Sequence, residues 1–185
     1  MMKQTVKIRC KNNGETKEIA IGSTLKEAYE AFGLSMEFGP INATVNNRTE
    51  GLNYRLYHNK DVEYFDLHSA TGERCYMRTL FFVLCKSVHD LYPDSKVVID
   101  IPVSNGYYCN LMLGHDVTET DVTRIRERMR QLIDAKLPIR RYEVPTEEAV
   151  RIFSSRGDKA KAKLLRSTGK LYTTCLLYTS DAADD

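Results

Sequence analysis

The sequence contains no tryptophan, only five prolines and no two cysteines in a Cys-x-x-Cys pair. Its five cysteines are scattered and odd in number, which fits reduced thiols better than a disulfide framework. No apolar run approaches the roughly 20 residues that a membrane-spanning helix needs, and residues 1–10 lack the apolar core of a signal peptide. These absences predict a cytoplasmic protein without a membrane segment.

Complete motifs of nucleotide-dependent or hydrolytic chemistry are absent as well. Residues 167–170 read Ser-Thr-Gly-Lys, but Leu164 stands where a phosphate-binding loop has its first glycine, and Leu171 stands where it has a hydroxyl. Cys85 and His89 are four residues apart, a spacing that puts two metal ligands on one helix face. No other cysteine or histidine has ligand spacing to them, so we favour a packed cysteine and predict no metal site.

The first third of the chain has the element order of a small mixed sheet around one helix. Residues 5–10 alternate polar and apolar side chains, as in a half-buried strand. Ser23 or Thr24 can cap a helix over residues 25–32, which ends at a glycine. The other expected strands are 17–21, 41–45 and 61–67. This order predicts a β-grasp fold.

The centre of the chain is organised around one strongly apolar helix. The preceding HSATGERCYM (68–77) is expected to be a loop with a short extended piece. From Arg78, apolar residues recur at helical spacing until Pro93, which cannot continue the helix. A hairpin should follow, on which the helix lies. Its strands are expected at 97–101 and 107–112, with Asn105-Gly106 as the two-residue turn.

A second amphipathic helix is expected after Thr118 or Thr120, either of which can act as its cap. A strand over 139–144 and a short helix capped by Thr146 should follow. The apolar stripe of the amphipathic helix is Val122, Ile125, Met129, Leu132 and Ile133.

Several of these segments resemble known families. GSTLKEA and INATVNN, with the N-terminal hairpin, resemble a TGS domain, the ubiquitin-like module of threonyl-tRNA synthetases, some GTPases and stringent-response enzymes. LYPDSKVVIDIPVSNGYYCNL is similar to the second N-terminal domain of threonyl-tRNA synthetases, which also occurs beside alanyl-tRNA editing proteins. The resemblance implies an α+β protein in which a TGS-like β-grasp domain (1–67) precedes a synthetase-like α+β domain (68–174).

In the family that it resembles, the second domain edits mischarged tRNA with a His-x-x-x-His pair. Counted back from Leu91-Tyr92-Pro93, the two positions fall on Arg78 and Phe82, and neither side chain replaces histidine as ligand or base. The resemblance therefore implies no catalytic residue in this chain. The same two domains precede the P-loop domain of bacterial uridine kinases, which lack these histidines. Asn110 also stands where the synthetases tend to carry an acidic residue.

We therefore expect the N-terminal accessory region of a bacterial nucleoside (uridine) kinase. Its kinase domain, with ATP and Mg²⁺, would follow in cis outside this chain, so the chain itself should be inactive and need no cofactor. The alternatives are a threonyl-tRNA-synthetase-like protein with a degenerate editing domain, or a structural docking or oligomerisation module. CLLYTSDAADD (175–185) resembles a translated sequencing adapter, and we expect it to be an artefactual tail outside the fold.

Charge is unevenly distributed along the chain. Residues 121–174 hold 14 lysines and arginines against 7 aspartates and glutamates, whereas residues 1–120 hold 13 against 15. A basic segment can bind a polyanion, so RNA or a nucleotide effector is the expected partner, and a merely solvated face is the alternative. Tyr107 and Tyr108 are expected to be core partners across the hairpin or to stack on bases. The residues expected to contact phosphate are Arg124, Arg128, Arg130, Arg140, Arg141 and Lys161.

Overall fold

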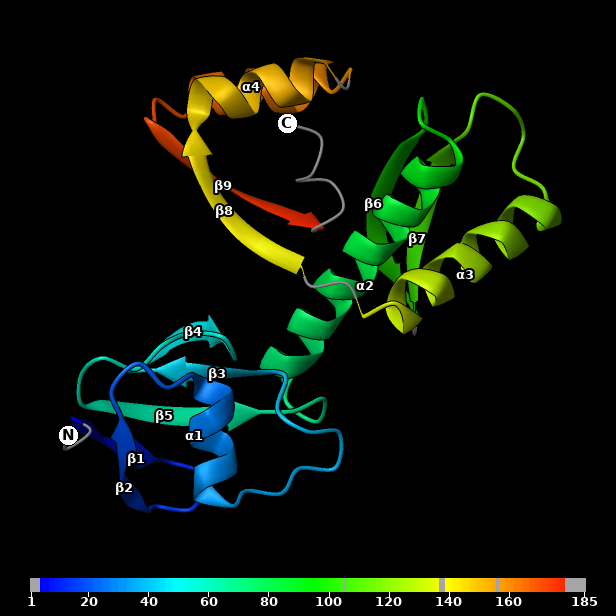
Figure 1. Cartoon of the computed structure of the whole chain (residues 1–185). Helices are drawn as coiled ribbons and strands as arrows, with labels where there is room; N and C mark the ends of the chain where they lie inside the picture. The colour runs from blue at the N-terminus through cyan, green and yellow to red at the C-terminus, as the bar shows by residue number, and fades with distance from the viewer. Residues whose placement is uncertain (1–3, 105, 137–138, 156, 179–185) are drawn as a thin grey trace. The chain divides into compact units, whose positions relative to one another are not determined.

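Figure 1 shows the protein as a computed structural model, which describes residues 4–104, 106–136, 139–155 and 157–178. Over these residues the chain forms five helices and nine strands, and the predicted α+β class is confirmed. None of the described helices is long and apolar enough to cross a membrane.

The chain divides into two compact units, Met1–Phe82 and Val83–Asp185, and the division falls inside one helix. The domain bounds 1–67 and 68–174 stay predictions. The first unit holds one sheet with the strand order β2-β1-β5-β3-β4, in which only β1 and β5 are parallel. This order, with one helix after the first hairpin, is the predicted β-grasp. Its elements are β1 (Thr5–Cys10), β2 (Thr16–Ala20), α1 (Leu25–Phe32), β3 (Asn42–Val45), β4 (Arg48–Gly51) and β5 (Lys60–Phe65).

The core of this unit follows from the spacing of apolar residues along its strands and along its helix. Alternation along β1 buries every second residue, and the helical spacing of α1 buries Leu25, Ala28 and Phe32. Tyr64 of β5 is buried with them, and its hydroxyl donates to the Leu25 carbonyl at 2.8 Å. Burial raises the pKa of Tyr64, so the hydroxyl stays a donor.

Local signals also set the ends of the elements in this unit. Thr24 caps α1 in a reciprocal capping box, because its Oγ1 accepts from the Glu27 amide and its own amide donates to the Glu27 carboxylate. Gly33 ends α1 with φ +66°. Asn46 and Asn47 have φ of +48° and +67°, which makes them the two-residue turn between β3 and β4.

The prediction of a loop at residues 68–77 is wrong, because helix α2 spans Ala70–Leu91. Ser69 lies directly before it and acts as a cap: its Oγ accepts from the Gly72 amide at 3.0 Å and donates to the Asp66 carbonyl at 2.9 Å. Gly72 is buried at this start. A Cβ added there would lie 1.9 Å from the Asp66 oxygen, so close packing requires the glycine.

The second unit contains the remaining elements and two separate two-stranded sheets, β6-β7 and β8-β9. The predicted hairpin is present, but Gly106 pairs with Val103, so the turn begins one residue earlier, at Ser104 (φ +54°). Asn105 lies outside the described residues. The elements are β6 (Lys96–Val103), β7 (Gly106–Met112), α3 (Glu119–Asp134), β8 (Ile139–Pro145), α4 (Thr146–Ser155), α5 (Lys159–Ser167) and β9 (Tyr172–Tyr178).

Two further expectations for the second unit need correction. Ile125 and Leu132 of α3 are buried, but Val122 and Ile133 are exposed, so the buried stripe is narrower than the predicted one. Strand β9 continues past residue 174, and residues 175–178 pair with β8, so these four residues are not outside the fold. That residues 175–185 are an artefactual tail stays a prediction. Residues 179–185 lie outside the described part of the chain.

Candidate functional site

The two positions that would carry editing histidines lie on α2, one turn apart. Arg78 is exposed and Phe82 is half-buried. A guanidinium group offers only N–H donors and a phenyl ring has no lone pair, so neither group can act as a metal ligand or a general base. Neither residue can therefore serve as the acid or the base of a hydrolytic reaction.

The Cys85–His89 pair on the same helix does not form a recognisable centre. Burial raises the pKa of the half-buried Cys85 thiol, and the neighbouring Cys109 of β7 raises it further, so the thiolate is disfavoured. His89 is exposed. Within residues that the structure describes, no three histidine, cysteine, aspartate or glutamate side chains gather as metal ligands.

A polar network surrounds the start of α3. Asp121 is buried and accepts from the Tyr92 hydroxyl at 2.6 Å, from Thr118 Oγ1 at 2.7 Å and from the Thr118 amide at 2.9 Å. His115 Nε2 lies 3.2 Å from the same carboxylate. The bonds from Tyr92 and Thr118 hold the pKa of Asp121 far below its usual range, so it is a permanent anion and no proton carrier at neutral pH.

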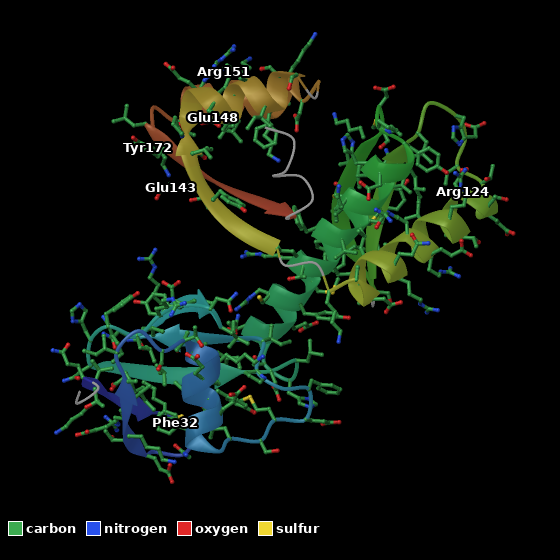
Figure 2. All side chains as sticks on the ribbon, viewed as in Figure 1. Phe32, Arg124, Glu143, Glu148, Arg151 and Tyr172 are labelled. Carbon is green, nitrogen blue, oxygen red and sulfur yellow. The ribbon has the colours of Figure 1, made fainter. Side chains whose placement is uncertain are left out.

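This network attaches the first turn of α3 to the end of α2. Tyr92 follows directly after α2, so its bond to Asp121 joins the end of that helix to the first turn of α3. Arg124, one turn further along α3, has its guanidinium 5.8 Å from the centre of the Tyr92 ring. Figure 2 shows Arg124 on this helix. The contacts of Tyr92 with Asp121 and Arg124 therefore hold in place the helix that carries the predicted phosphate-binding arginines.

The arginines of α3 are not equivalent. Arg128 donates to one oxygen of Asp90 through Nε at 3.0 Å and Nη2 at 2.7 Å, while Lys86 lies 2.8 Å from the other oxygen. Partial burial of Asp90 opposes ionisation, but the bonds from Lys86 and Arg128 still lower its pKa. The guanidinium group of Arg128 is therefore already bonded within the protein. Arg124, Arg126 and Arg130 are exposed to solvent.

The remaining predicted phosphate contacts lie on β8 and α5. The structure gives the backbone of Arg140 and Arg141 in β8, but their side chains lie outside its described part. Lys161 of α5 is exposed, with its ammonium 4.3 Å from the centre of the Phe153 ring in α4. Tyr107 and Tyr108 of the hairpin are 42% and 58% exposed, so both lie at the surface and are not core residues.

No protein-family model matches the chain. Threonine–tRNA ligases match it over most of its length. The ligase of Acetivibrio thermocellus is 26% identical over 97% of this chain, and that of Natranaerobius thermophilus is 29% identical over 85%. The chain is similar to threonine–tRNA ligases.

Threonine–tRNA ligase 2 of Bacillus subtilis is also similar to the chain, with 26% identity over 83% of the chain's length. The chain spans about a quarter of the length of these ligases, between 24% and 28%. The ligase similarity supports the synthetase-like resemblance. Of the two predictions made from the sequence, this similarity favours a synthetase-like segment over the accessory region of a uridine kinase.

The sequence did not reveal the partners that decide which arginines are available. The Thr118-x-x-Asp121 spacing of a capping box was the signal that could have indicated the buried carboxylate.

Proposed function

We propose that the chain is an accessory, RNA-binding segment of a threonyl-tRNA-synthetase-like protein and that it has no editing activity of its own. The observation that carries the proposal is the match to threonine–tRNA ligases over most of the chain. Proteins named threonine–tRNA ligase act on tRNA, and a related segment is suited to contact the same polyanion.

The exposed arginines of α3 are the proposed contact points with RNA phosphates. Arg126 and Arg130 are one turn apart, so their guanidinium groups lie on the same face of the helix. Guanidinium groups bind phosphate oxygens with paired hydrogen bonds. Arg128 is left out of this set because its guanidinium group is already bonded to Asp90. Tyr108 offers an exposed ring on which an unpaired base can stack.

Salt dependence of binding to a tRNA transcript tests this role. Each lost phosphate contact should lower the slope of log affinity against log salt by about one. We expect the Arg126→Ala/Arg130→Ala variant to bind more weakly and with a slope smaller by about two. Arg48→Ala, which removes an exposed arginine of β4, is the matched control and should bind as the parent does. An unchanged slope in the double variant, or no binding at low ionic strength, would refute the proposal.

The absence of editing is tested separately with a mischarged aminoacyl-tRNA. Because Arg78 and Phe82 stand at the two positions counted from the resemblance, the chain should not accelerate deacylation above the rate in buffer. Metal-independent or metal-dependent deacylation by the pure chain would show that another group performs the hydrolysis.

A second candidate is the accessory region of a nucleoside kinase, with a TGS domain as its first part. Arg78, Phe82 and Asn110 favour it, since these residues depart from the synthetase pattern. ATP and Mg²⁺ would then act in a separate P-loop domain. The reading frame downstream of Thr174 distinguishes the two. A Gly-x-x-x-x-Gly-Lys-Ser/Thr motif there supports the kinase, and a class II synthetase core supports the ligase-like protein.

A further inference from the structure

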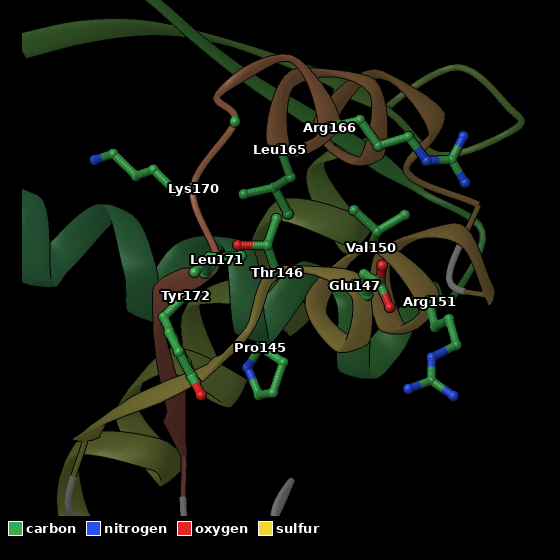
Figure 3. A pocket seen from close by; sticks show the side chains of 11 residues that line it. Pro145, Thr146, Glu147, Val150, Arg151, Leu165, Arg166, Lys170, Leu171 and Tyr172 are labelled. Carbon is green, nitrogen blue, oxygen red and sulfur yellow. The ribbon is translucent and has the colours of Figure 1, made fainter.

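A cleft of about 940 Å³ lies where the N-terminus of α4 meets the end of α5 and the start of β9 (Figure 3). Val150 and Leu165 give it an apolar lining. Tyr172, at the start of β9, lines it as well and is 58% exposed. The volume is in the range of sites that hold a small molecule. The cleft belongs to none of the features assigned so far.

The charged lining of the cleft is predominantly cationic. Arg151 of α4, Arg166 of α5 and Lys170 contribute three positive charges, and Glu147 contributes one negative charge. Figure 3 shows the two guanidinium groups on the same side of the cleft and the lysine on the opposite side. The N-terminus of α4 adds the positive end of a helix dipole. The balance favours an anion that carries two charges.

A buried hydroxyl at the cleft lacks a partner. Thr146, the first residue of α4, is 8% exposed and lines the cleft. Its amide donates to the Leu171 carbonyl at 2.9 Å, but its Oγ1 has no hydrogen-bond partner within the described residues. Buried hydroxyls are normally satisfied, and an unsatisfied one costs stability. A polar group placed at the start of α4 would supply the missing bond.

From this combination we infer that the cleft binds a nucleoside 5′-phosphate, as a free mononucleotide or as the 5′-terminal nucleotide of an RNA. Arg151 and Arg166 hold the phosphate, and the Tyr172 ring stacks on the base. Thr146 Oγ1 bonds to a polar group of the ligand near the start of α4.

Each part of the ligand matches a part of the cleft. A phosphate monoester carries a charge of about −1.5 to −2 at neutral pH, which complements the excess of two positive charges. A planar base can lie against the exposed tyrosine ring and the apolar residues Val150 and Leu165. A phosphate alone would leave this apolar wall unused, and a nucleoside alone would leave both arginines unpaired.

Isothermal titration of the full chain with adenosine 5′-monophosphate, uridine 5′-monophosphate, adenosine and inorganic phosphate tests the site. We expect a mononucleotide to bind at least about tenfold more tightly than adenosine or inorganic phosphate, because only it engages both parts of the cleft. A 5′-phosphorylated RNA hexamer and its 5′-hydroxyl counterpart distinguish the two sources. Binding of the phosphorylated hexamer alone identifies an RNA end, and binding of a mononucleotide identifies a free nucleotide. Binding of none of these overturns the inference.

Variants then place the binding in the cleft. Arg151→Ala/Arg166→Ala and Tyr172→Ala should each weaken binding about tenfold or more. Lys159→Ala removes an exposed lysine of α5 outside the cleft and should have no effect. Thr146→Val keeps the side-chain shape, should leave the unliganded protein at least as stable, and should weaken binding. Equal binding by all variants would overturn the assignment. The mononucleotide assay does not involve the α3 arginines, so its failure leaves the proposed function standing.

Discussion

Replacing Gly72 by alanine tests the packing of the first turn of α2. Alanine is the better helix former, so helix propensity alone predicts stabilisation by up to about 1 kcal/mol. The structure predicts the opposite. The new Cβ would lie 1.9 Å from the Asp66 oxygen and 2.7 Å from its carbonyl carbon, and both are backbone atoms that cannot rotate away.

The size of the effect follows from the displacement that is needed. Restoring the 1.9 Å contact to an ordinary distance of about 3.4 Å moves the helix start or the Asp66 peptide by about 1.5 Å. Overpacking of this kind costs about 1–3 kcal/mol. The same movement weakens the 2.9 Å hydrogen bond from Ser69 to Asp66, which is worth about 1 kcal/mol. After the gain in helix propensity, we expect a net loss of about 2 kcal/mol in the free energy of unfolding.

Urea unfolding followed by far-ultraviolet circular dichroism measures this loss, and a thermal scan should show a melting temperature lower by about 4–8 °C. Gly51→Ala in β4 is the matched control, because an added Cβ there meets no atom within 4 Å in the described part of the chain. The control should change stability by less than about 0.5 kcal/mol. A Gly72→Ala protein as stable as the parent would show that α2 does not begin against Asp66.

Three further perturbations report on single contacts. Thr24→Ala removes the side-chain half of a capping box and should destabilise the protein by about 1 kcal/mol in urea, and an unchanged midpoint would contradict the cap. The pKa of Asp121 is lowered in the folded state, mainly by Tyr92, so its stabilisation is present above the unfolded pKa of about 3.9 and is lost as the pH falls. Asp121→Asn should therefore flatten the acid side of a plot of melting temperature against pH, and an equally steep fall would refute the network. The hydrogen bond to Glu37 raises the pKa of His68, so this pair stabilises below about pH 6.5 and fades as the pH rises through the folded pKa. Glu37→Gln should lower that pKa in an NMR titration, and no change would exclude the pairing.

The β-grasp was predictable because its signals are local and agree with one another. The alternation of residues 5–10 gives a buried face, Thr24 has the spacing of a capping box, and Asn46-Asn47 tolerates the positive φ of a tight turn. Each signal needs only a few neighbouring residues. Strand β4, which follows this turn, was missed because Arg48–Gly51 has no apolar alternation.

The first turns of α2 could not be read in the same way. A glycine inside a segment usually indicates a loop. At position 72 the glycine is required because the backbone of Asp66 lies against it, and that contact exists only in the folded chain. The arginines of α3 show the same limit. Their number and spacing were visible in the sequence, but the loss of Arg128 to Asp90 depends on how α2 and α3 meet. The cleft at α4 joins residues from three elements and had no sequence signal.

The position of β5 has a consequence for how the protein is made. β5 is the last strand of the first unit to be synthesised, yet it lies in the middle of the sheet and pairs with both β1 and β3. Until Phe65 has left the ribosome, the two hairpins have no common partner, and β1 and β3 each present an open edge to other chains. Pairing of Ile8 with Lys60 must also close a long loop, which slows folding. The emergence of β5 is therefore the step at which the nascent chain changes from two separate, aggregation-prone hairpins to one five-stranded sheet, in which β1 and β3 no longer have open edges.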